Sequence, residues 1–132
     1  MVANRYRGLW LNCALAVALP AAAHHSFAAY DQTRAITLNG IAKNIQWDNP
    51  HVIIRVWVPV AGSNVAQEWS LVTSNPGILK HLGWTQRSIN PGDRIRVLCQ
   101  PKRNGTYSGR LITLFELDSG KTLDTKLSAA AH

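Results

Sequence analysis

Apolar residues recur at every second position through most of this chain, and this period of two constrains its fold more than any other feature. In residues 51–58, valine or isoleucine occupies every even position. Related patterns run through residues 36–47, 65–73, 94–100 and 109–117. Because successive side chains of a strand point to opposite faces, this spacing predicts a chain that is mainly β.

One segment departs from this period and predicts a short helix. Residues 74–77 read Ser-Asn-Pro-Gly, Ile78, Leu79 and Leu82 follow, and Gly83 closes the segment. A polar cap, proline at the first helical position and glycine after the last are typical of a short helix. The predicted order is therefore three strands, a helix and two strands, with a short final strand after the turn at 118–121.

This order favours an all-β fold with one short helix, an OB-like five-stranded Greek-key barrel in which a long first strand serves both sides. A small antiparallel β-sandwich is the alternative. The first strand changes phase, because Ile36 and Leu38 share one parity and Ile41 and Ile45 the other. The change falls at Asn39-Gly40, which predicts a β-bulge there.

The first residues have the three regions of a secretory signal. Arg5 and Arg7 precede an apolar run over residues 9–19, and Pro-Ala-Ala-Ala follows at 20–23. The run is too short to span a bilayer, so we expect cleavage after Ala23 and no transmembrane segment in the mature chain. The protein is then periplasmic or secreted.

These limits give three expected parts: a signal peptide at 1–23, the barrel domain at 24–124 and a flexible tail at 125–132. Removing two arginines with the signal lowers the formal net charge from +7 to +5. Cys13 leaves with the signal, so Cys99 has no internal disulfide partner. Its alternation with other apolar residues predicts a buried side chain rather than a redox centre.

Several motifs of the mature chain resemble a family of small secreted bacterial proteins known only as a domain of unknown function. The motifs are His24-His25-Ser26-Phe27, Leu38-Asn39-Gly40-Ile41, Trp47-Asp48-Asn49-Pro50-His51, Gly83-Trp84 and Pro91-Gly92-Asp93. The resemblance covers essentially the whole mature chain. It implies no established activity, so the function must be argued from the chemistry of the residues.

An amino-terminal histidine predicts a copper site. Cleavage before His24 would free an amine whose nitrogen, with the ring of the same residue, can chelate one ion. An imidazole from elsewhere would complete a histidine brace, and three nitrogens in a plane suit tetragonal Cu(II). We expect His51 to supply that ring, because Pro50 stiffens the turn that presents it.

His25 is the rival ligand. Cleavage one residue earlier would leave Ala23-His24-His25, in which a histidine in third place also favours square-planar Cu(II). Phe27, Trp47 and Asp48 are candidates for the groups around the metal ligands.

Basic residues near the last two strands suggest a different function. OB barrels bind oligosaccharides or oligonucleotides across one face, and such sites combine cations with aromatic rings. The candidate residues are Arg94, Arg96, Arg103, Tyr107 and Arg110. Because export removes the protein from most nucleic acid, an anionic glycan, lipid or other envelope component is the expected partner.

Signs of an enzyme are weak. The chain has no Gly-x-Ser-x-Gly motif and no close carboxylate pair with an evident acid and base. We therefore expect a copper carrier or buffer in preference to a catalyst.

Overall fold

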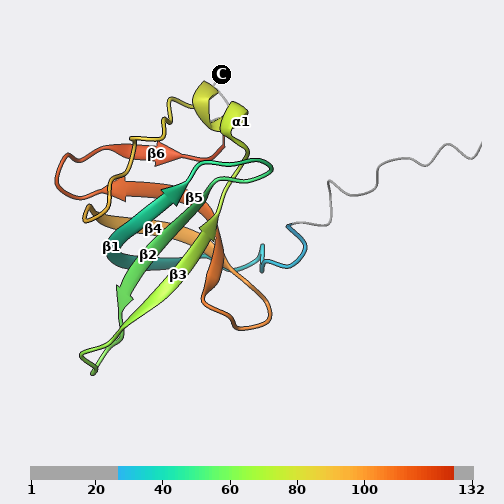
Figure 1. Ribbon diagram of the computed structural model, residues 1–132. Coiled ribbons are helices and arrows are strands. Elements are labelled where there is room, and N and C mark those ends of the chain that lie inside the picture. The colour runs from blue at the N-terminus through green and yellow to red at the C-terminus, as the bar shows by residue number, and fades with distance from the viewer. Residues whose placement is uncertain (1–26, 127–132) are drawn as a thin grey trace, which may run out of the picture.

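Six strands and one short helix make up the part of the fold that the structure describes (Figure 1). The computed structural model describes residues 27–126. The signal peptide predicted at 1–23 and the residues around its cleavage site lie outside this range. In chain order the elements are β1 (Ile36–Gln46), β2 (Ile53–Pro59), β3 (Ala66–Val72), α1 (Pro76–His81), β4 (Arg94–Pro101), β5 (Ser108–Glu116) and β6 (Thr122–Asp124).

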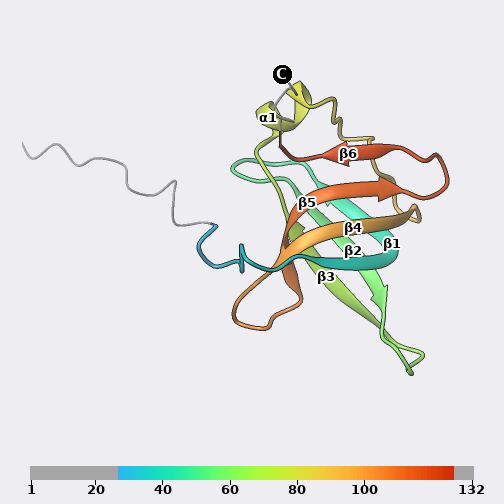
Figure 2. The ribbon, with the colours of Figure 1, turned by 180° about the vertical axis from the view of Figure 1, so that it is seen from behind.

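The sheet closes on itself. Its strand order is β3-β2-β1-β4-β5-β6, and a parallel pairing between β3 and β5 joins the two sides. β1 pairs with β4 through its first half and with β2 through its second half, so the long first strand does serve both sides. The result is a closed five-stranded OB-like barrel with β6 added beyond β5, which confirms the predicted barrel over the sandwich alternative (Figures 1 and 2).

The interior of the barrel is filled by the alternating apolar residues of the strands. Every second residue of β4 is buried, and so are the alternate residues Ile54 and Val56 of β2. Cys99 belongs to this core and is fully buried, which confirms the prediction from its alternation. Burial raises the pKa of its thiol to about 11. The largest core side chains are Trp84, Ile54, Leu71, Leu79, Ile89, Ile95, Leu111 and Leu114.

The irregularity of β1 lies farther along the strand than the sequence predicted. The register against β4 is continuous from Ile36 to Ile41, and the shift against β2 falls between Ala42 and Asn44. Ala42 is therefore buried and Ile41 is 39% exposed, so the predicted inward position of Ile41 is wrong. Ala42 has the same parity as Ile36 and Leu38 and faces the interior, but alanine is too small to mark an inward-facing position clearly in the sequence.

Gly40 has a different role, which is close approach of two strands. A Cβ at this position would lie 2.4 Å from the backbone oxygen of Trp57 and 2.7 Å from Cγ1 of Val56. Only glycine lets β1 and β2 cross at this separation. The residue marks the tightly coiled part of the barrel wall rather than a bulge.

The helix begins and ends as predicted. The Asn75 side chain accepts a hydrogen bond from the Ile78 N–H at 2.9 Å, Pro76 opens the helix, and Gly83 follows it with φ +85°. α1 lies at one end of the barrel, beside the end of β6 (Figures 1 and 2). No helix in the described part of the chain has the length and apolar character needed to cross a bilayer.

The ordered chain continues past the predicted domain limit at 124. Thr125 is 8% exposed, and its hydroxyl donates to the carbonyl oxygens of Leu111 and Ile112, each at 2.9 Å. A buried hydroxyl with two acceptors belongs to the packed domain. The tail predicted from residue 125 therefore cannot begin there, and residues 127–132 lie outside the described range.

Candidate functional site

His51 lies two residues before β2, and its ring contacts Thr73, the residue that follows β3. Its Nδ1 lies 3.0 Å from the backbone oxygen of Thr73. Because a carbonyl oxygen only accepts hydrogen bonds, Nδ1 is the donor in this bond, and Nε2 is left as the ring nitrogen without a recorded partner among the described residues. Two backbone bonds between Val52 and residues 73 and 74, both 3.0 Å long, hold these strand ends together. Orientation of the ring by a backbone carbonyl is the usual arrangement behind a metal-binding histidine.

Phe27 packs against this ring. The ring centroids of Phe27 and His51 are 5.8 Å apart with a 59° angle between planes. The guanidinium of Arg110, on β5, covers the Phe27 ring at 4.0 Å from its centroid. Phe27 is thus held between a cation and an imidazole, next to the one predicted metal ligand that the structure describes.

The segment that carries Phe27 is attached to the barrel by its backbone. Arg103 N–H donates to the Ala29 oxygen at 2.9 Å, and Asp31 N–H donates to the Pro101 oxygen at 2.8 Å. Tyr30, between them, is 6% exposed. Residues 27–31 therefore form a fixed strap over the loop between β4 and β5, and we call this segment the strap.

The other two predicted metal ligands, His24 and His25, lie outside the described residues. They precede Phe27 by three and two positions. Residues 27–126 contain no group of three or more His, Cys, Asp or Glu side chains that could hold a metal ion. The structure therefore locates His51 and the beginning of the strap, and it gives no position for the remaining ligands.

The five residues predicted to bind a polyanion occupy three different settings. Arg94 forms a salt bridge with Asp118, and Arg96 donates from Nε to the Asn39 side-chain oxygen at 2.8 Å. Both lie on the outer side of β4, and each already donates at least one hydrogen bond to a neighbouring side chain.

Arg110 faces Phe27, as described above. Arg103 and Tyr107 line one pocket, which lies under the loop between β4 and β5 and has a volume of about 350 Å³. No single groove joins the five, because β4 places alternate residues on one outer face while residues 103 and 107 belong to the following loop.

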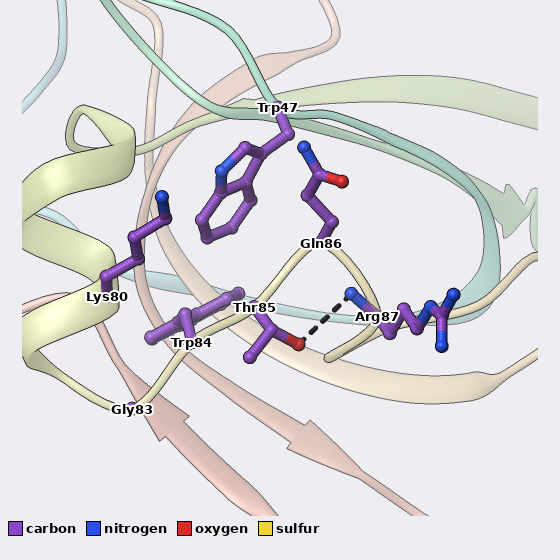
Figure 3. Close-up of a pocket in the computed structure, with 7 residues that line it drawn as sticks. All are labelled: Trp47, Lys80, Gly83, Trp84, Thr85, Gln86 and Arg87. Carbon is purple, nitrogen blue, oxygen red and sulfur yellow. Dashed lines mark hydrogen bonds between the residues drawn. The ribbon is translucent and has the colours of Figure 1, made fainter.

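A larger cleft lies between α1 and the β1–β2 connection, and the sequence did not reveal it. It has a volume of about 730 Å³ and is lined by residues 83–87 together with Trp47 and Lys80. In Figure 3, Lys80 and Gln86 extend toward Trp47, whereas the Arg87 side chain points away. Trp47 therefore lines this cleft; no contact with His51 is recorded for it.

Trp84 forms the buried side of this cleft. It is 1% exposed, and its Nε1–H donates to the Asp124 carbonyl oxygen at 2.7 Å. Two of the motifs noted in the sequence, at Trp47 and at Gly83-Trp84, thus meet at one place. The motifs themselves were visible in the sequence, but their meeting depends on how α1 folds back over the barrel end.

These features define a small OB-like barrel protein with an oriented histidine beside its amino-terminal strap. The chain belongs to a family described as a family of unknown function (DUF6152), whose model matches residues 13–111. Comparison with curated proteins and with solved structures found no match.

Proposed function

We propose that the exported protein binds Cu(II) through a histidine brace built from its new amino terminus and His51. The amine and ring nitrogen of His24 would chelate the ion, and Nε2 of His51 would be the third nitrogen. The observation that carries this proposal is the contact of Phe27 with the His51 ring, because it anchors the chain beside the predicted ligand just three residues after His24.

The length of chain is sufficient. Three residues span at most about 10 Å when extended, since each adds about 3.3–3.6 Å. A chelating amine and ring attached to Phe27 by this short tether therefore have a high effective concentration at His51. The strap supports the same reasoning, because the backbone bonds of Ala29 and Asp31 hold it against the barrel and so fix the point from which the tether starts.

The orientation of the His51 ring also suits a metal. With Nδ1 donating to Thr73, Nε2 is the ring nitrogen available for coordination. Nitrogen donors in a tetragonal arrangement favour Cu(II) over metals that prefer oxygen or thiolate ligands. Since Cys99 is buried in the barrel, no thiolate of the described residues competes for the ion.

His25 remains the alternative ligand. Cleavage after Ala22 would leave a chain in which the amine, the intervening amides and the ring of His25 could bind copper without His51. The two arrangements differ in whether His51 is needed. In either case the small domain would act as a carrier or buffer that holds copper in the periplasm or outside the cell.

The test is a Cu(II) titration of the exported protein, with its amino terminus established by mass spectrometry. We expect a nitrogen-rich tetragonal EPR spectrum for the wild type. His24→Ala and His51→Ala should each weaken binding by more than about 100-fold, because loss of groups merely behind a ligand already costs 10- to 100-fold. His81→Ala changes a histidine on α1, away from the strap, and should leave affinity unchanged.

Two further variants test the anchoring. Addition of a methionine before His24, made together with His25→Ala so that no histidine stands in third place, displaces the amine from His24 and should abolish the brace spectrum. Phe27→Ala keeps every ligand but releases the tether, and we expect affinity to fall about tenfold. Unchanged affinity in both His51→Ala and the methionine-extended protein would overturn the proposal, and loss only on His25→Ala would assign copper to the alternative arrangement.

A further inference from the structure

We infer that the pocket under the β4–β5 loop binds a phosphorylated sugar unit. The inference is separate from the copper proposal and uses none of the proposed copper ligands. We call this site the loop pocket. Its lining residues are Asp31, Arg34, Ile36, Trp69, Pro101, Lys102, Arg103, Gly105, Thr106 and Tyr107.

The walls of the loop pocket are held in place by the backbone. Lys102 N–H donates to the Ser108 oxygen at 2.9 Å, and Ser70 N–H donates to the Tyr107 oxygen at 3.0 Å, so both ends of the loop are fixed. The strap closes one side through the bond between Arg103 and Ala29. Within the loop, both the N–H and the hydroxyl of Thr106 donate to the Asn104 side chain. A site with fixed walls loses little freedom when a ligand binds.

The charge of the loop pocket is positive and lacks full compensation. Three cations, Arg34, Lys102 and Arg103, line it with a single carboxylate, Asp31. None of the three forms a salt bridge with a carboxylate of residues 27–126, in contrast to Arg94 and Lys43. The pocket therefore has a net charge of about +2, which matches a phosphate monoester better than a single carboxylate.

The cations that line the loop pocket also affect the pKa of Asp31. Hydrogen bonds from Thr33 hold the pKa of Asp31 below its ordinary value, and the charges of Arg103 and Arg34 lower it further. Because the carboxylate is turned toward Thr33, which donates both its N–H and its hydroxyl to Oδ1, it does not neutralise either arginine by direct pairing. An anion can therefore still bind the two guanidinium groups.

Two aromatic rings give the loop pocket an apolar wall. Tyr107 is 54% exposed and packs edge-on against Trp69, with 5.6 Å between ring centroids. An exposed tyrosine held by a tryptophan provides a rigid surface for a ring. The volume of about 350 Å³ is near the lower end for small-molecule sites, about 300–1,000 Å³, so it suits one sugar unit and not a stretch of polymer.

The experiment is a titration of the metal-free mature protein with glucose 6-phosphate, followed by NMR shifts or calorimetry. Glucose and inorganic phosphate test the ring and the charge separately, and glucuronate tests a singly charged sugar. We expect glucose 6-phosphate to bind at least fivefold more tightly than any of the three, with affinity falling as salt increases. Equal binding of inorganic phosphate and glucose 6-phosphate would show an adventitious anion site and overturn the inference.

Variants then assign the binding to this pocket. Arg34→Gln and Arg103→Gln should each weaken binding at least fivefold, whereas Asp31→Asn should strengthen it about threefold by removing the one negative charge. Tyr107→Ala should weaken glucose 6-phosphate but leave inorganic phosphate unchanged. Far-UV circular dichroism of each variant establishes that the barrel is intact.

Matched controls remove the same charge elsewhere. Lys121→Gln, in the connection before β6, and Arg87→Gln, at the larger cleft, should change affinity less than twofold. If Arg87→Gln weakens binding while Arg103→Gln does not, the ligand binds in the larger cleft and the inference is wrong. Vesicles with a phosphorylated inositol headgroup form the last arm: binding to them and not to the free sugar phosphate identifies a lipid as the source, and binding to neither overturns the inference.

Discussion

Replacing Gly40 by alanine should destabilise the barrel more than the same change at a glycine whose surroundings are open, such as Gly120. The added Cβ would lie 2.4 Å from the Trp57 backbone oxygen and 2.7 Å from Cγ1 of Val56, about 1 Å inside ordinary contact. The Val56 side chain can rotate, but the Trp57 oxygen belongs to the ladder with β1 and can move only with its strand. Overpacking against side chains costs about 1–3 kcal/mol, and the fixed backbone places this case at about 3 kcal/mol.

The measurement is urea unfolding of the protein, followed by tryptophan fluorescence. A loss of about 3 kcal/mol corresponds to a fall in melting temperature of about 15 °C for a domain of this size. Gly120→Ala is the matched control, because Gly120 has φ +73° with no heavy atom near its added Cβ and pays only the backbone cost of about 1 kcal/mol. The reasoning about close approach fails if Gly40→Ala is no more destabilising than Gly120→Ala.

Three other predictions follow from buried or paired groups. Trp84→Phe removes core volume and the indole donor bonded to the end of β6, so the free energy of unfolding should fall by about 2–4 kcal/mol. The control Trp57→Phe, at a part-exposed tryptophan, should cost less than about 1 kcal/mol, and equal losses would contradict the prediction. The Cys99 thiol, buried and with its pKa raised to about 11, should react with a disulfide reagent only after denaturation, and rapid labelling of the native protein would be inconsistent with its burial. The hydrogen bond from Lys43 holds the pKa of Glu68 below its ordinary 4.5, so this carboxylate stabilises the fold at neutral pH and loses that effect as pH falls from about 4.5 through the lowered pKa. Glu68→Gln should flatten the acid side of a plot of unfolding free energy against pH, and an unchanged plot would argue against the pairing.

Much of the fold could be predicted from the sequence because its signals are local. The alternation of residues 51–58 reports a strand with one buried face, and the Asn75, Pro76 and Gly83 signals report both ends of the helix. The barrel followed from the order of these elements. The position of the irregularity in β1 did not follow, because Ala42 fits either face of a strand and the crowding at Gly40 depends on a second strand.

The candidate sites depend on contacts between distant parts of the chain, so the sequence could show less of them. His51 was recognisable by its residue type and its place after proline, but its hydrogen bond to Thr73 depends on the pairing of β2 with β3. Similarly, Arg103 and Tyr107 were visible as a basic and an aromatic residue. That Arg34 joins them could be seen only once the strap was placed against the β4–β5 loop.

The bond between Trp84 and Asp124 bears on where this domain can be cut. The family match ends at residue 111, within β5 and before β6 begins. A fragment shortened to that limit would lose half of β5 and the carbonyl of Asp124 that accepts a hydrogen bond from the buried Trp84 indole, so we expect it not to fold. The segment that the family model matches is therefore shorter than the segment that the domain needs in order to fold.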